Sequence, residues 1–131
     1  MTEAEVIRQM RAHLESLFPK RCPKCGRTYD SLREYLQNTT PMGPAIPYDV
    51  ELGDWQPQEP LGLATYANCR CGNTMGMTSH GMPLVQLWRL LRWAQTETKR
   101  RRLTPQELLN YLRDEISQQV LAEPAAGDAG K

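Results

Sequence analysis

Cys22-Pro23-Lys24-Cys25-Gly26 and Cys69-Arg70-Cys71-Gly72 are the two stretches that decide the fold, because they contain all four cysteines of the 131-residue chain. Thiolates bind Zn²⁺ in a tetrahedron with Zn–S distances of about 2.3 Å, so two ligands must come from one compact turn. Each pair fits such a turn, and the glycine after it lets the backbone reverse direction. Four thiolates leave no position open for water, so the sequence predicts one structural Zn²⁺ bound by Cys22, Cys25, Cys69 and Cys71.

The Cys-Pro-x-Cys-Gly stretch resembles one knuckle of the zinc-ribbon proteins, and the resemblance covers residues 20–29 and 66–77 without pointing to a specific family. It implies two zinc knuckles that converge on one ion. The second pair departs from the commoner ribbon pattern, since a single residue separates its cysteines. A C-x-C pair combined with a C-x-x-C pair also resembles the zinc centre of redox-switched chaperones, in which the two pairs occur in the opposite order. That resemblance implies that the four thiols sense oxidants and release zinc on oxidation.

Three other uses of four cysteines are alternatives to zinc. Disulfides are typical of oxidising compartments, whereas the acidic stretch Met1-Thr2-Glu3-Ala4-Glu5 lacks the basic and then apolar pattern of a secretory signal. An iron–sulfur cluster also takes four thiolates, but this spacing fits neither common ferredoxin pattern. A thioredoxin-like site uses one C-x-x-C motif and leaves the second pair unexplained. We therefore expect a cytoplasmic zinc protein, without the apolar run of about 20 residues that crosses a membrane.

Helix signals flank the cysteine turns on both sides. Thr2 and Glu5 form a capping box ahead of a helix expected over residues 3–18, which Pro19 ends. A shorter helix follows Ser31. Pro83 and the capping box Thr104-Pro105-Gln106-Glu107 begin two more helices, and their short linker predicts an antiparallel hairpin over residues 83–121. The apolar side expected for the first of these two consists of Leu84, Leu87, Trp88, Leu90, Leu91 and Ala94.

The segment between the cysteine turns is irregular by composition. Residues 39–60 contain five prolines, which few helices or central strands tolerate, so we expect a Pro-rich loop there. Residues 61–68 and 74–79 have the composition of two short strands. The sequence thus predicts a single zinc-stapled domain over residues 1–123 and a disordered tail, 124–131. The expected fold class is α+β, with a small zinc-ribbon-like β-hairpin packed against an N-terminal helix and the C-terminal antiparallel helical hairpin.

Charge is distributed unevenly although the formal net charge is only +1. Residues 39–60 carry four acidic and no basic side chains, whereas residues 61–102 carry seven basic and one acidic. One helix holds a candidate contact surface for nucleic acid or an acidic partner, formed by Arg89, Arg92, Trp93, Lys99, Arg100, Arg101 and Arg102. The alternative is structural, because cations near a helix C-terminus stabilise its dipole and cap its last carbonyls. Trp93 is accordingly either part of the core or an exposed anchor.

No catalytic arrangement stands out in the sequence. His13 and His80 are expected to be structural, since Ser79-His80 lacks a placed acid and an oxyanion signature. Tyr48 and Trp55 either pin the Pro-rich loop to the domain or form a recognition surface. The sequence therefore predicts a non-enzymatic zinc-binding regulatory or adaptor protein that binds a protein partner. A thiol-based redox switch and a nucleic-acid binder using helix residues 89–102 are the alternatives, and the oligomeric state is open between monomer and dimer.

Overall fold

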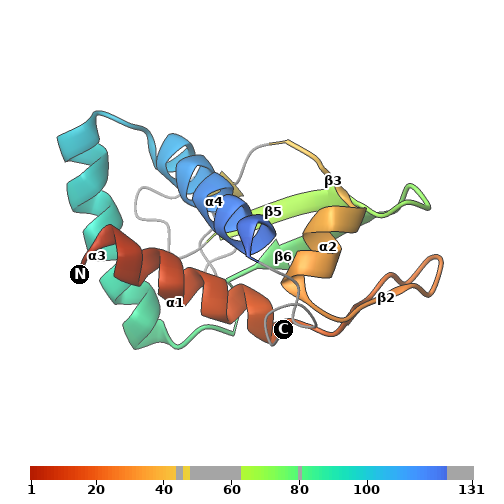
Figure 1. The fold of residues 1–131 in the computed structure, drawn as a ribbon. Coiled ribbons are helices and arrows are strands. Elements are labelled where there is room, and N and C mark those ends of the chain that lie inside the picture. Colours follow the sequence, from red (N-terminus) through yellow and green to blue (C-terminus); the bar gives the residue numbers. More distant parts are fainter. Residues whose placement is uncertain (44–45, 48–62, 80, 124–131) are drawn as a thin grey trace.

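The computed structural model describes residues 1–43, 46–47, 63–79 and 81–123, which form a mixed α+β fold (Figure 1). Its helices are α1 (Glu3–Ser16), α2 (Leu32–Asn38), α3 (Leu84–Arg101) and α4 (Pro105–Ala122). Its strands are β1 (Lys20–Arg21), β2 (Thr28–Tyr29), β3 (Thr40–Pro41), β4 (Ile46–Pro47), β5 (Leu63–Asn68) and β6 (Thr74–Thr78). The predicted fold class is confirmed, because an N-terminal helix and a C-terminal helical pair accompany two small antiparallel sheets. None of the described helices is long and apolar enough to cross a membrane.

α1 begins and ends close to the predicted positions. The Glu5 N–H donates to the Thr2 hydroxyl and the Thr2 N–H donates to the Glu5 carboxylate, so the capping box forms. The helix ends at Ser16, two residues before the predicted end at residue 18, because the residue before a proline is disfavoured in helical backbone. The buried stripe of α1 consists of Val6, Ile7, Met10 and Leu14.

Each cysteine turn connects two antiparallel strands. β5 and β6 pair from Asn68 opposite Thr74 to Ala64 opposite Thr78, which confirms the predicted hairpin around the second turn. The first turn connects β1 and β2, a much shorter pair in which Lys20 lies opposite Tyr29. Each strand pair therefore positions the cysteine turn that connects its two strands.

The edge of β5 opposite β6 carries two further short strands. Thr40 in β3 lies opposite Asn68, and Ile46 in β4 lies opposite Ala64. Composition predicts a loop over residues 39–60. In the structure, residues 40–41 and 46–47 of that range are strands instead. The prolines of β3 and β4 fit, because an edge strand does not need every backbone N–H for pairing. The predicted two-stranded hairpin is therefore widened on one side.

α3 and α4 form the predicted C-terminal helical pair. α3 is followed by Arg102, whose φ of 56° is left-handed and whose N–H donates to the Thr98 carbonyl oxygen. α4 begins with the predicted capping box, in which the Thr104 hydroxyl accepts from the Glu107 N–H. Both helix ends at the linker are thus capped by local hydrogen bonds.

The inward side of α3 differs from the prediction. Leu87 and Leu91 are buried, and Leu90 packs beside them at partial burial. Leu84 and Trp88 were expected to face inward, but they are 47% and 46% exposed. The first turns of α3 lie at the margin of the molecule (Figure 1). Only the flank with Leu87 and Leu91 therefore meets other helices, and the periodicity of apolar residues does not reveal which flank that is.

One hydrophobic core joins the cysteine turns to the helices. Cys22, Tyr29 and Cys69 belong to the same cluster of buried residues as the apolar stripes of α1 and α4. The Phe18 and Tyr29 rings each meet the ring of Tyr35 edge-on, with ring centroids 5.6 Å apart. The stripe of α4 consists of Leu108, Leu112, Ile116 and Val120, as its spacing predicts. Cys22 and Cys69 are therefore core residues.

Several predictions concern positions outside the described residues. These are most of the Pro-rich loop with Tyr48 and Trp55, the first two positions of the strand expected over 61–68, His80, and the tail 124–131. The other histidine is described. The Nε2 atom of His13 lies 3.0 Å from the Thr78 carbonyl oxygen, so this side chain ties α1 to β6.

Candidate metal centre and the surface of α3

The first cysteine turn is closed by backbone hydrogen bonds around Cys22. The Cys22 N–H donates to the Arg27 carbonyl oxygen, and the Gly26 N–H donates to the Cys22 carbonyl oxygen, each at 2.9 Å. Gly26 has a φ of +79°, a left-handed conformation that glycine adopts without a clash. A Cβ at this position would lie 3.2 Å from the Arg21 guanidinium. The glycine after the C-x-x-C pair is thus needed for both backbone conformation and space.

The second turn repeats this pattern with one residue fewer between the cysteines. The Cys69 N–H donates to the Asn73 carbonyl oxygen, and the Gly72 N–H donates to the Cys69 carbonyl oxygen, each at 2.8 Å. Gly72 is also left-handed, with a φ of +92°. The C-x-C pair therefore forms a compact turn of the same kind as the C-x-x-C pair.

The two turns bring the four sulfur atoms together. The Cys22 Sγ lies 3.7 Å from the Cys71 Sγ, and the Cys25 Sγ lies 3.7 Å from the Cys69 Sγ. All four sulfurs lie within 4.8 Å of one another, and none is in a disulfide. Four sulfurs bound at about 2.3 Å to one ion lie about 3.8 Å apart at the corners of a tetrahedron. The four cysteines are positioned to hold one metal ion.

The site is buried on one side and open on the other. Cys22 and Cys69 are buried in the core, Cys71 is partly buried, and Cys25 is exposed. Each turn thus supplies one inner thiol and one outer thiol. The hydrophobic core would shield an ion held here on the side of Cys22 and Cys69. Solvent would reach the ion on the side of Cys25.

A buried tyrosine supports the inner cysteine of the second turn. The Tyr29 hydroxyl lies 2.9 Å from the Cys69 Sγ. This contact and the Cys71 N–H lower the pKa of the Cys69 thiol to about 6. Burial, followed by the hydrogen bond to Cys69, raises the pKa of Tyr29 to about 12. The phenol therefore stays protonated and donates to a thiolate.

The pKa values of Cys22 and Cys25 are shifted in opposite directions. The backbone N–H of Cys25 is the main cause of the lowered pKa of Cys22, and the Asn73 side-chain amide also donates to the Cys22 Sγ at 3.6 Å. The Arg27 N–H favours the Cys25 thiolate, but partial desolvation of the sulfur by the surrounding turns and the neighbouring thiols together raise the pKa of Cys25 to about 11. Before a metal binds, negative charge gathers on the inner thiols. Metal binding then releases the proton that Cys25 retains.

Sequence reasoning missed Tyr29 and Asn73 as parts of this site. Both lie inside the two ranges assigned to the knuckles, and both carry a hydrogen-bond donor. Groups that hydrogen-bond to metal ligands commonly orient them and adjust their basicity. A donor side chain within a few residues of a predicted thiolate ligand is the signal that would have found them.

We expect Tyr29→Phe to weaken metal binding by about 10–100-fold, as is typical when a partner of a metal ligand is removed. The ring and its contact with Tyr35 are retained, so the change isolates the hydrogen bond to Cys69. Competition with a chromophoric zinc chelator measures the affinity. Tyr111→Phe is the matched control, because that hydroxyl bonds to Glu3 and should leave metal affinity unchanged. Equal affinities of the two variants would contradict the supporting role of Tyr29.

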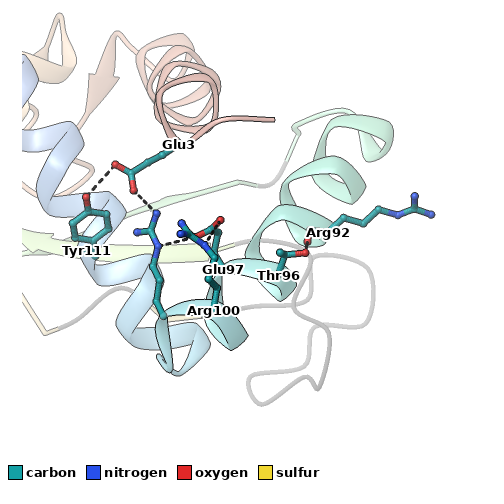
Figure 2. Close-up of polar contacts among 7 residues, drawn as sticks. Glu3, Arg92, Thr96, Glu97, Arg100 and Tyr111 are labelled. Atoms are coloured by element: carbon teal, nitrogen blue, oxygen red, sulfur yellow. Dashed lines mark hydrogen bonds and ion pairs between the residues drawn. The ribbon is translucent and has the colours of Figure 1, made fainter.

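The C-terminal cations of α3 are largely engaged within the fold. Arg101 forms ion pairs with Glu3 and Glu97 at 2.7 Å, and Arg100 pairs with Glu97 at 2.7 Å. Figure 2 shows Glu3 also approached by Tyr111 of α4, whose hydroxyl donates to it at 3.0 Å. The Arg101 guanidinium lies 5.7 Å from the centroid of the Trp93 ring and 5.5 Å from that of Tyr111. This junction holds α1, α3 and α4 together.

The seven residues predicted to contact a ligand therefore divide into two groups. Trp93, Arg100 and Arg101 belong to the junction, and Trp93 is half-buried against the core. The other four are exposed and form no ion pair with a described residue: Arg89, Arg92, Lys99 and Arg102. In Figure 2 the side chain of Arg92 extends away from the junction.

Apolar and basic side chains share the outward side of α3. Leu84, Val85 and Trp88 are 47%, 66% and 46% exposed, and Arg89 and Arg92 continue this side along the helix. Residues three and four apart are neighbours on a helix surface, so these five form one patch. We call Leu84, Val85, Trp88, Arg89 and Arg92 the outer α3 surface. Figure 1 shows α3 at the opposite end of the molecule from the cysteine turns.

No family model matches this chain, and no characterised protein or solved structure matches it either. The candidate sites are accordingly defined by geometry: four convergent thiols at one end, and an exposed apolar and basic helix surface at the other.

Proposed function

We propose that the four cysteines bind one Zn²⁺ and that its role is structural. The convergence of all four sulfurs within 4.8 Å of one another supports a four-thiolate site, and thiolates favour zinc among the common divalent ions. A complete set of protein ligands leaves no position for a substrate or water. Zinc would close the chain between Cys22 and Cys71, which contains α2 and the four strands β2, β3, β4 and β5. We therefore propose a non-enzymatic protein in which the metal maintains the fold.

We further propose that this zinc-stabilised domain is an adaptor or regulator that binds a protein partner through the outer α3 surface. The exposure of Trp88 beside Val85 and Leu84 is the observation that carries this proposal. Tryptophan and arginine are enriched among the residues that dominate binding energy at protein interfaces. A contiguous exposed apolar patch with charged neighbours is typical of an interaction site. Trp88 is the expected central anchor.

The charge of the surface selects the chemistry of the partner. Arg89 and Arg92 flank the apolar residues and have no acidic partner among the described residues. Complementary charges steer association and disfavour unsuitable partners. The proposed occupant is a protein segment that presents apolar side chains together with Asp or Glu, such as one face of an acidic amphipathic helix.

Selection from a displayed peptide library tests this proposal. The zinc-loaded protein is used for selection, and Trp88→Ala is used for counter-selection. The expected consensus contains apolar residues at helical spacing with interspersed Asp or Glu. Trp88→Ala should weaken the selected peptides by about 30-fold or more, the loss that corresponds to a hot-spot residue. Fluorescence anisotropy of labelled peptides measures these affinities.

Two variants make the result specific. Leu121→Ala removes an exposed leucine from α4 and should leave affinity unchanged. Arg89→Glu with Arg92→Glu should abolish the preference for acidic peptides and its dependence on salt. Peptides that bind Trp88→Ala and the parent protein equally would overturn the proposal. Sedimentation of the free protein tests a second copy as the occupant, because a dimer that Trp88→Ala dissociates would assign this surface to self-association.

A redox switch is a second candidate, favoured by the exposure of Cys25 and by the 3.7 Å spacing of the Cys22–Cys71 and Cys25–Cys69 sulfurs. In the proposed step, hydrogen peroxide takes two electrons from two thiolates and two protons from water. One disulfide forms, peroxide becomes two water molecules, and the zinc ion loses two ligands and dissociates. A metal-sensitive dye measures the released zinc. No release at modest peroxide doses would exclude this candidate.

The nucleic-acid alternative is less well supported. Arg100 and Arg101 are paired with acidic side chains, so they are not free to neutralise phosphates. Four exposed cations remain on and just after α3. Binding through phosphates would weaken steeply with rising salt, because counterions are released. Absence of salt-dependent binding to DNA or RNA in an anisotropy titration would remove this alternative.

A further inference from the structure

A cavity of about 160 Å³ lies between the helices and the sheet. Side chains of α1, α2 and α4 line it, together with residues of β5 and β6. Protein interiors are close-packed and contain few voids larger than a water molecule. An apolar cavity of about 150 Å³ is large enough to bind benzene. This cavity therefore has room for an organic molecule the size of one ring.

The lining is mainly apolar but contains two buried hydroxyl-bearing side chains. Leu14, Met77 and Ile116 supply apolar walls from three different elements. Tyr35 is 1% exposed, and its hydroxyl has no hydrogen-bond partner in the described structure. Thr65 is also buried and lines the cavity. Buried polar groups are normally paired, so the Tyr35 hydroxyl indicates room for a polar atom of a ligand.

The charges at the cavity are already neutralised. Arg113 and Asp114 both line it, and their side chains pair with each other at 3.2 Å. Arg113 also donates to the Gly43 carbonyl oxygen at 2.9 Å. No other charged side chain of the described chain lines the cavity. An ionic ligand would therefore lose its hydration without gaining a counter-charge.

We propose that this cavity is a binding site for a small neutral organic molecule with one ring and one polar group. The ring fills the apolar part, and the polar group hydrogen-bonds to the hydroxyl of Tyr35 or Thr65. This site is separate from the four cysteines and from the outer α3 surface, so it adds small-molecule binding to the proposed adaptor function. A bound ring would supply the van der Waals contacts that the walls of an empty cavity lack.

The proposal is tested by titrating the zinc-loaded 131-residue chain with phenol, toluene and benzoate. Nuclear magnetic resonance follows each titration. The amides of cavity residues should shift saturably with phenol and more weakly with toluene, which has no polar group. A single hydrogen bond corresponds to about tenfold in affinity. Benzoate carries a charge on the same ring and should not bind. Binding of benzoate as tight as that of phenol would overturn the neutral-ligand assignment.

Variants locate the binding. Ala67→Leu fills the cavity and should abolish binding of phenol and toluene, whereas Ala4→Leu on the exposed side of α1 should not. Tyr35→Phe and Thr65→Val keep the shape, so they decide the question if Ala67→Leu does not fold. One of them should lower phenol affinity about tenfold and leave toluene affinity unchanged. No saturable binding of either neutral probe, or binding that all three cavity variants retain in full, would overturn the proposal.

Discussion

Cys69→Ser is expected to lose the metal ion and to abolish cooperative unfolding of the domain. Structural zinc sites contribute about 10–16 kcal/mol of apparent binding free energy in zinc-finger peptides, comparable to the whole stability of about 5–15 kcal/mol of a typical domain. Cys69 is buried and belongs to the main core, so its loss also disturbs the packing around Tyr29. Thermal unfolding by circular dichroism and metal content by mass spectrometry measure the effect.

Lys24→Ala is the matched control for this experiment. Lys24 lies in the first cysteine turn between two proposed ligands, but it is exposed, so metal content and stability should be retained. A strong chelator in the presence of a reductant should reproduce the effect of Cys69→Ser, and added zinc should reverse it. A chelated protein that unfolds at the same temperature as the untreated protein would contradict a structural metal.

Leu112→Ala is expected to destabilise the domain by about 2–5 kcal/mol, the range measured for buried leucines. Leu112 is 2% exposed and packs in the cluster that contains Cys22 and Cys69. Leu121→Ala is the control on the same helix, because Leu121 is 43% exposed and such surface changes remain within about 0.5 kcal/mol. Urea unfolding, followed by circular dichroism, measures both differences.

The same experiment tests whether residues 1–123 form a single domain. If α4 and the cysteine turns share one core, Leu112→Ala should lower the stability of the metal centre and of the helices together. Zinc release and loss of helix should then have the same urea midpoint. Separate midpoints would show that the helical pair and the cysteine turns are independent units.

Local signals in the sequence predicted much of this fold. The capping boxes at Thr2 and Thr104 located the starts of α1 and α4, because a cap depends on residues three positions apart. The spacing within each cysteine pair predicted two turns, and the sulfur distances agree with one ion. Neither inference needs knowledge of distant parts of the chain.

Features that depend on distant residues were not predictable in the same way. The spacing of Leu84 and Trp88 equals that of the buried Leu87 and Leu91, yet only the second pair meets other helices. Periodicity defines an apolar stripe but not which flank of it is covered. The support of Cys69 by Tyr29 depends on how two separate turns meet. Partners and packing of this kind follow from tertiary structure.

The register of β4 and β5 has a consequence for variation in chain length. Pro47 lies opposite Leu63, so these two positions are neighbours in the sheet although they are far apart in the sequence. The entropy of closing a loop depends only weakly on its length, with each doubling adding about 0.6 kcal/mol. As far as the strand pairing is concerned, residues can be inserted or deleted between these two positions without altering the register. This is the place where a reporter peptide would be grafted, and where related sequences would be expected to differ most in length.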